Sequence, residues 1–254
     1  MSKKIYFNPC GFGFWYQLGV LNSIIDEDVY IYGASSGSLI CLISILKKKD
    51  RNIVDLLDKC NEIKNNLFKK GPMYFVNIYN YSSSLVEVIF NKMISEKYSE
   101  EYIQNKLKYI NIYVTEIKFK GSKKKKLPHL KSKFINPKNI DELREFVISS
   151  CYFPILSYHK NFFYYKYKNK CLIDICFLKN LDDPTIHAVQ SEYSTIIPCD
   201  SVKALQMYNK GLKYSFNNKK KTKSYSIIFF LFKTIFGLFF LLLNYLRKKI
   251  FLLG

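Results

Sequence analysis

The sequence predicts an α/β fold with a mainly parallel central sheet. Two short β-branched and aromatic runs, residues 5–8 and 29–32, each lead into a stretch with glycines. An apolar segment with helical spacing follows each of them, at 14–25 and 39–46. Strand, glycine loop and helix, twice in succession, are typical of adjacent parallel strands whose loops lie at one edge of the sheet. The 254 residues suffice for one domain with a full core, or for a smaller domain with an appendage.

The middle of the chain predicts mainly helices. Residues 51–67 have the pattern of an amphipathic helix. Residues 73–98 are rich in aromatic side chains, and a helix is expected in their second half. Ser99, followed by two glutamates, is a favourable helix start for residues 99–107.

The remainder of the chain predicts strands, a hairpin and two further helices. Residues 109–116 are β-branched and aromatic, which predicts a strand. We interpret the basic segment 118–133 as a solvated hairpin tip in preference to a dedicated anion-binding patch. A helix is expected from residue 139 to about 150, before Pro154. The other expected elements are strands at 171–178, 184–189 and 194–197 and a surface helix at 201–212.

Composition restricts the partners and the compartment. The formal net charge is +20, from 40 Lys and Arg against 20 Asp and Glu, which favours nucleic acid, an acidic lipid surface or acidic substrates. The basic residues are spread along the chain without a nucleic-acid-binding motif, so no nucleic acid is expected as a partner. Seven Cys without a C-x-x-C pair, and only three His, favour reduced thiols inside the cell and argue against a metal site. The N-terminal residues do not have the pattern of a signal peptide.

A Gly-x-Ser-x-Gly motif, residues 33–37, lies between the second expected strand and its helix. On a tight strand-to-helix turn the hydroxyl of Ser35 is lifted out of the backbone, and Gly33 and Gly37 allow the strained turn and close packing. The positive end of the following helix favours the anion that acyl transfer generates. The motif also arises by chance as a glycine-rich turn, so by itself it does not decide between a nucleophile and a turn.

The glycine loop at residues 10–13 has two interpretations. A glycine loop before a helix can cradle a phosphate, but the Gly-Lys-Ser/Thr and G-x-G-x-x-G patterns are missing here. The same geometry suits an oxyanion hole better. The backbone N–H groups of Gly11, Phe12 and Gly13 would then point at the place where Ser35 leaves the next strand.

A candidate base is Asp174, a carboxylate within the apolar run 171–178. A carboxylate in such a run is costly to bury without a partner. A Ser-Asp-His triad in the order Ser35, Asp174, His187 is available, but an α/β-hydrolase places more strands before its nucleophile, and His187 is expected as an ordinary polar residue of a strand. A Ser-Asp dyad needs no histidine, provided that desolvation brings the pKa of the aspartate toward the working pH.

Four ordered blocks resemble the patatin-like phospholipase family, in particular its adiponutrin and adipose triglyceride lipase branch. Residues 10–20 are similar to the oxyanion segment of that branch with its Cys-Gly-Phe sequence, and residues 32–39 to its nucleophile elbow, with Ser36 where alanine is usual. Residues 147–154 resemble the segment that leads to the catalytic aspartate. Asp174, in Leu-Ile-Asp, falls where that aspartate belongs. The resemblance covers residues 5 to 200 of this sequence.

The resemblance implies a three-layer α/β/α patatin-like fold for a domain of residues 1–215. It also implies hydrolysis of fatty acyl esters of phospholipids or acylglycerols by a Ser35–Asp174 dyad, without a metal or cofactor. Ser35 would be the nucleophile and Asp174 the base, and the N–H groups of Gly11, Phe12 and Gly13 would hold the oxyanion.

Two departures from the family pattern keep a second function open. Ile175 and Cys176 follow the aspartate where the family has glycine, and a β-branched residue disfavours a positive-φ turn. Of the family's three oxyanion glycines, only Gly11 is in register. The alternative hypothesis is a catalytically weak or inactive patatin-like protein that binds lipid or serves as a scaffold at a membrane.

The C-terminal part, residues 216–254, predicts a basic linker and a membrane-associated helix. Residues 227–246 are almost wholly apolar, close to the ~20 residues that a helix needs to cross a bilayer. Lysines and arginines flank the segment on both sides, so its orientation stays open. Membrane attachment, either spanning or interfacial, is favoured over a buried terminal helix. We therefore expect an intracellular protein attached to a membrane, whose positive charge favours anionic lipid.

Overall fold

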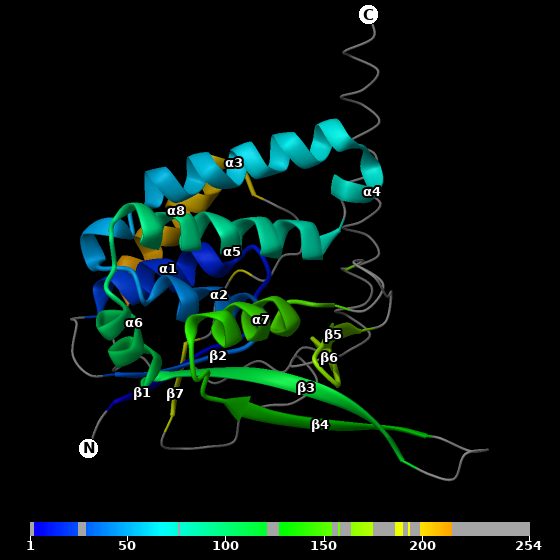
Figure 1. Cartoon of the computed structure of the whole chain (residues 1–254). Coiled ribbons are helices and arrows are strands. Elements are labelled where there is room, and N and C mark those ends of the chain that lie inside the picture. Colours follow the sequence, from blue (N-terminus) through cyan, green and yellow to red (C-terminus); the bar gives the residue numbers. More distant parts are fainter. Residues whose placement is uncertain are drawn as a thin grey trace, which may run out of the picture.

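A mixed β-sheet of seven strands runs through the part of the chain that the computed structural model describes (Figure 1). The described residues are 3–24, 29–75, 77–120, 127–153, 157, 164–174, 186–189, 193 and 199–214. The strands are β1 (Lys4–Phe7), β2 (Tyr30–Gly33), β3 (Ile110–Lys120), β4 (Leu127–Ile135), β5 (Tyr165–Tyr167), β6 (Lys170–Ile173) and β7 (His187–Val189). Four neighbouring strands, β7, β1, β2 and β3, are parallel to one another. Strands β4 and β6 pair antiparallel with β3, and β5 pairs antiparallel with β6. The predicted α/β class is confirmed.

Strand β3 organises the sheet because it pairs with three other strands. The partner β4 follows one edge of β3 from Ile112 to Lys120 without interruption. A strand has only two edges, so β2 and β6 must share the other edge. There β2 pairs in parallel as far as Ile112, and β6 pairs antiparallel from Thr115 onward. The last residues of β2 and β6 therefore approach each other along a single edge of β3.

The helices begin largely where side chains can cap them. They are α1 (Phe14–Ser23), α2 (Ser36–Ile43), α3 (Ile53–Lys70), α4 (Pro72–Phe75), α5 (Ile78–Ser95), α6 (Glu100–Leu107), α7 (Ile140–Ser150) and α8 (Ser201–Leu212). An Asn, Ser or Asp side chain accepts a first-turn N–H at five of these starts, which satisfies a backbone donor that the helix itself leaves unpaired. These residues are Asn52, Asn77, Ser99, Asn139 and Asp200.

Two sequence predictions need correction. The segment 73–98 is helical through most of its length, in α4 and α5, and not only in its second half. The first half of α5 also contains small and aliphatic residues, such as Ser82 and Leu85, which are buried. The helix therefore begins earlier than predicted, at the Asn77 cap. The segment 118–133 is mostly strand, because β3 and β4 continue into a long hairpin (Figure 1). Its hairpin nature is confirmed, and residues 121–126 lie outside the described residues.

The main core lies between the sheet and the helices. Alternate residues of the strands, among them Ile5, Phe7, Ile112 and Val114, pack with buried residues from the helices. The opposite face carries a smaller cluster, in which the Phe134 ring lies 5.0 Å from the rings of both Tyr32 and Tyr113. In the described residues, that cluster contains no helical side chain. Figure 1 accordingly shows α1, α2, α5 and α7 stacked on one side of the strands.

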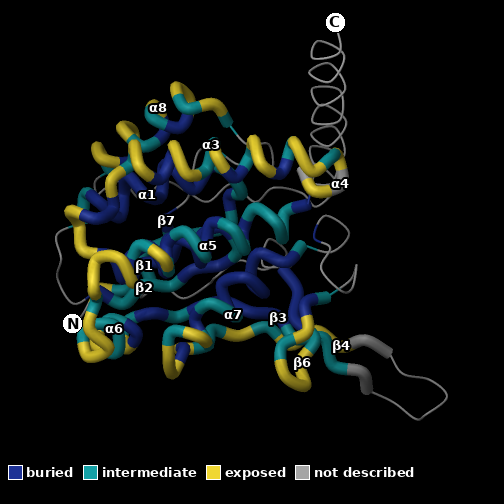
Figure 2. Tube along the Cα trace, turned by 45° about the horizontal axis from the view of Figure 1, so that its top comes forward, coloured by how far each residue is buried: buried dark blue, intermediate teal, exposed yellow. Residues whose placement is uncertain are grey.

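Helix α8 is the surface helix that the sequence predicts for 201–212, and its inner face packs closely on α1. It crosses α1 at two glycines: a Cβ on Gly19 would meet the Tyr208 carbonyl oxygen at 2.1 Å, and a Cβ on Gly211 would meet the Tyr16 carbonyl oxygen at 2.1 Å. Glycine lets the two backbones approach this closely. In α3 and α8, the exposed residues lie on the outer face of each helix (Figure 2).

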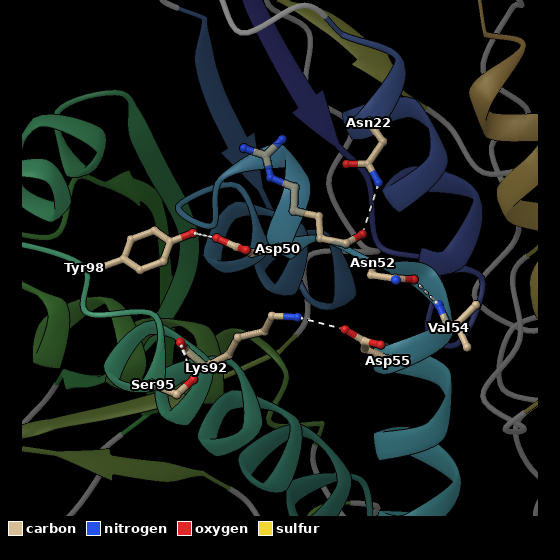
Figure 3. A network of polar contacts seen from close by, with 9 residues as sticks. Asn22, Asp50, Asn52, Val54, Asp55, Lys92, Ser95 and Tyr98 are labelled. Carbon is tan, nitrogen blue, oxygen red and sulfur yellow. Dashed lines mark hydrogen bonds and ion pairs between the residues drawn. The ribbon is translucent and has the colours of Figure 1, made fainter.

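Helix α2 is buried over all eight residues and is tied at its C-terminal end by a buried arginine. The Arg51 guanidinium donates to the carbonyls of Leu46 at 2.6 Å and Ser44 at 2.8 Å. The adjoining residue, Asp50, accepts the Tyr98 hydroxyl at 2.6 Å, and Asp55 pairs with Lys92 at 3.1 Å (Figure 3). This network joins α2 to α3 and α5, so it has a structural role.

Two buried thiols make the fold sensitive to alkali. Burial raises the pKa of Cys41 and of Cys151 far above the usual value of 9.0. Above that pH an unfolded thiol loses its proton while the native one keeps it, so stability falls as pH rises. We expect each thiol to lower the free energy of unfolding by about 1.4 kcal/mol per pH unit in this range.

Urea unfolding between pH 8 and pH 10 would measure this loss. The Cys41→Ala variant should be less stable at pH 8 because of its cavity, but its stability should fall less steeply with pH than that of the wild type. An unchanged slope in this variant would contradict the assignment.

Candidate active site

The backbone of Ser35 is strained. Ser35 lies between β2 and α2 with φ 52° and ψ −127°, a combination that non-glycine residues seldom adopt. Such a conformation costs about 1–3 kcal/mol and persists only where the surroundings enforce it. The serine of the Gly-x-Ser-x-Gly motif therefore lies on a sharp strand-to-helix turn, half-buried at the start of a buried helix.

The two motif glycines are needed for close packing. A Cβ on Gly33 would lie 2.3 Å from the Gly37 carbonyl oxygen and 2.5 Å from Cys41 Sγ. A Cβ on Gly37 would lie 2.0 Å from the Phe7 carbonyl oxygen. The start of α2 thus presses directly on the end of β1, which fixes the turn against the sheet.

Side chains bind both peptide groups of Ser35. The Ser35 N–H donates to Ser150 Oγ at 2.9 Å. The Ser35 carbonyl accepts Ser38 Oγ at 2.5 Å and Cys151 Sγ at 3.1 Å. Ser150 and Cys151 lie at the C-terminal end of α7, so a helix distant in sequence holds the turn in its strained shape.

The glycine loop before α1 is joined to the same turn. The Cys10 N–H donates to Ser36 Oγ at 2.9 Å, a contact that an alanine at position 36 could not make. Gly11 has φ 56°, a conformation that glycine adopts much more readily than other residues. The Gly13 N–H donates to the Cys10 carbonyl at 3.0 Å, so it is used within the loop. For the other two predicted oxyanion donors, the N–H groups of Gly11 and Phe12, no hydrogen bond is found among the described residues.

Asp174 is a buried carboxylate at the end of β6, with 4% of its surface exposed. Its N–H donates to the Tyr152 carbonyl at 2.8 Å. Tyr152 follows Ser150 and Cys151, whose side chains bind Ser35, so one short segment contacts both predicted dyad residues through their backbones.

The strand register brings these two residues to one gap in the sheet. Gly33, the last residue of β2, pairs with Ile112, and Ile173, the last residue of β6, pairs with Thr115. The two levels are three residue steps apart along β3, about 10 Å at a rise of ~3.3 Å per residue. Ser35 follows the end of β2 and Asp174 follows the end of β6, so the two residues flank this interval, and Ser150 Oγ donates within it to the Tyr113 carbonyl at 2.8 Å.

The electrostatics of the gap favour a neutral thiol next to a carboxylate. Burial first, and then the negative charge of Asp174, raise the pKa of Cys151. The thiol is therefore protonated at neutral pH and acts as a donor to Ser35. A nucleophilic role for Cys151 would require the thiolate, so the geometry leaves Ser35 as the candidate nucleophile.

The histidines of the described residues are not part of this gap. His187, the first residue of β7, pairs with Ile5 on β1, whereas Gly33 pairs with Phe7, two residues further along β1. The His187 ring contacts the Tyr214 hydroxyl. His129 is exposed on β4. A Ser35–Asp174–His187 triad therefore finds no support in the arrangement of the strands.

Sequence reasoning did not identify the residues that hold the site. Ser36, Ser38, Ser150 and Cys151 all bind the turn or its loop through side chains. Their positions could have been suspected only from their place in the blocks 32–39 and 147–154. In the described residues, no three His, Cys, Asp or Glu side chains gather closely enough to hold a metal ion.

Comparison with models of protein families, with characterised protein sequences and with solved structures finds no match for the chain. Among the helices of the described residues, none is long and apolar enough to cross a membrane. The predicted C-terminal segment, 227–246, lies outside the described residues, as do Ile175, Cys176 and His159.

Proposed function

We propose that the chain is a lipid acyl hydrolase of the phospholipase A or acylglycerol lipase type, which cleaves fatty acyl esters through an acyl-enzyme on Ser35. The observation that carries the proposal is the strained conformation of Ser35, at the gap toward which β6 delivers Asp174. Strain of this kind clusters at functional sites, because the fold must use other contacts to maintain it. A patatin-like three-layer α/β/α fold for residues 1–215 belongs to the same proposal; of its layers, the described residues supply the sheet and the helices on one face.

In the proposed mechanism, the Ser35 hydroxyl attacks the ester carbonyl and transfers its proton to the Asp174 carboxylate. The N–H groups of Gly11 and Phe12 and the N-terminal end of α1 stabilise the oxyanion. The leaving alcohol takes the proton from Asp174 as the tetrahedral intermediate collapses. Asp174 then removes a proton from water, which attacks the acyl-enzyme, and Asp174 returns that proton to the Ser35 oxygen as the second tetrahedral intermediate collapses and the fatty acid leaves. A Ser-Asp dyad performs these steps without a cofactor.

The proposed substrate is a phospholipid or acylglycerol at an intracellular membrane. The net charge of +20 supports docking on an anionic lipid surface. The apolar run 227–246, with basic flanks, supports attachment of residues 216–254 to the membrane. A lipid substrate is drawn from such a surface without first entering water, so attachment and hydrolysis suit each other.

A second candidate function is a lipid-binding or scaffolding protein of weak or no activity. Ile175, directly after the proposed base, supports it, since a β-branched residue restricts the turn that follows.

Labelling of the full chain by a fluorophosphonate probe tests the proposal. We expect the wild type to be labelled and the Ser35→Ala variant to lose labelling, because only an activated serine attacks the probe. The Ser83→Ala variant is the control, since it removes a hydroxyl that bonds only within α5, to the Tyr79 carbonyl at 2.7 Å and to Asn80. Labelled wild type would then be assayed with phospholipid and acylglycerol substrates. No labelling of folded, liposome-bound wild type would overturn the hydrolase and favour the scaffold.

A further inference from the structure

We infer that Ser150 is a positioning residue, which sets the place of Ser35 relative to Asp174; this role presupposes the proposed hydrolase. Ser150 touches no reacting atom in the proposed mechanism. It acts through the backbone of the nucleophile, by the hydrogen bond from the Ser35 N–H.

The two hydrogen bonds of Ser150 fix its hydroxyl in one orientation. A hydroxyl has a single proton to donate, and here the proton goes to the Tyr113 carbonyl on β3 at 2.8 Å. The oxygen lone pairs are thereby turned toward the Ser35 N–H at 2.9 Å. Ser150 is only 1% exposed, so water cannot replace either contact freely. The hydroxyl thus connects the nucleophile turn to the strand that both dyad segments share.

The turn that contains Ser150 also holds the proposed base. Cys151 Sγ donates to the Ser35 carbonyl at 3.1 Å, and the Tyr152 carbonyl accepts the Asp174 N–H at 2.8 Å. The main chain joining Ser150, Cys151 and Tyr152 is short and buried. A shift of Ser35 away from Ser150 is therefore a shift relative to Asp174 as well, and a displacement of about 1 Å at a reacting group can cost 10²-fold in rate.

A matched control lies one residue before Ser150. Ser149 is equally buried, but its hydroxyl donates to the Phe146 carbonyl of its own helix at 3.0 Å. Replacing Ser149 by alanine removes a buried hydroxyl from the same turn and leaves the link to Ser35 intact.

The test compares wild type, Ser150→Ala, Ser150→Thr and Ser149→Ala as full chains. The readouts are the rate constant of fluorophosphonate labelling and the kcat and KM for p-nitrophenyl butyrate, measured well below each variant's Tm. We expect Ser150→Ala to lower labelling and kcat about 10- to 100-fold with little change in KM. Ser150→Thr should recover most of the loss, since it retains the hydroxyl, and Ser149→Ala should stay within about twofold of wild type.

The outcomes separate this role from the proposed function. Labelling of the wild type together with equal rates in Ser150→Ala overturns the role of Ser150 and leaves the hydrolase standing. Equal losses in Ser150→Ala and Ser149→Ala also overturn it, because the effect would then be general to the turn. If Ser150→Ala does not fold, Ser150→Cys replaces it: a thiol is a poor acceptor, so slower labelling supports the role and an unchanged rate refutes it. Absence of Ser35-dependent labelling in the wild type overturns the hydrolase, and this role with it.

Discussion

Replacement of Asp174 by asparagine is expected to lower kcat for ester hydrolysis by about 10²–10⁴-fold, the usual contribution of a positioned general base. Asparagine has nearly the size of aspartate but cannot accept the Ser35 proton. The N–H of residue 174 still donates to the Tyr152 carbonyl, because that bond belongs to the backbone. The variant should therefore stay folded while labelling and hydrolysis both fall.

Asp50→Asn is the matched control for this substitution. Asp50 is also a buried carboxylate, 7% exposed, but it accepts the Tyr98 hydroxyl in the network behind α2 (Figure 3). We expect Asp50→Asn to lower the free energy of unfolding by about 1–2 kcal/mol through the weakened charged hydrogen bond and to leave kcat unchanged. Equal kcat in wild type and Asp174→Asn would exclude Asp174 as the base.

Replacement of Gly37 by alanine is expected to destabilise the fold by at least about 2 kcal/mol, although alanine is the better helix former. The added Cβ would lie 2.0 Å from the Phe7 carbonyl oxygen and 2.7 Å from its carbon, both backbone atoms that cannot rotate away. Relief requires α2 to move off β1, and that movement displaces Ser35. Thermal unfolding and fluorophosphonate labelling should show losses together.

The sign of the change makes this test decisive. Helix propensity alone predicts that Gly37→Ala stabilises the protein by about 1 kcal/mol, since residue 37 lies in the first turn of α2. A raised Tm would therefore refute the close approach of helix and strand. Gly33→Ala should behave like Gly37→Ala, because its Cβ would meet the Gly37 carbonyl oxygen at 2.3 Å.

Much of this architecture could be predicted from local patterns. The β-branched runs, the glycine loops and the cap of α6 at Ser99 are encoded within a few residues each, and the corresponding elements form where expected. The sequence analysis did not predict that β3 and β4 extend into the segment 118–133, because the many lysines of that segment obscure the strand pattern. Pairing between the two strands of the hairpin stabilises them there.

The supports of the candidate site depend on contacts between residues far apart in sequence. Nothing near Ser150 indicates that its hydroxyl accepts the Ser35 N–H, 115 positions away. The use of the Gly13 N–H within its own loop was likewise hidden, since it depends on the loop's conformation and not on residue type. The close approach of α8 to α1 depends on Gly19 and Gly211, two residues far apart in sequence that no local pattern relates.

The sharing of one β3 edge by β2 and β6 also has a consequence for the order of events during synthesis. The chain emerges with Ser35 early, but the hydroxyl of Ser150 and the carboxylate of Asp174 follow only after α7 and β6 have been made. Until then the turn at Ser35 lacks the contacts that hold its positive φ, and the edge of β3 beyond Ile112 is not yet paired with β6. A nascent chain that ends before β6 therefore carries neither the contacts that hold the Ser35 turn nor the proposed base, so the proposed dyad can assemble only after the domain is nearly complete.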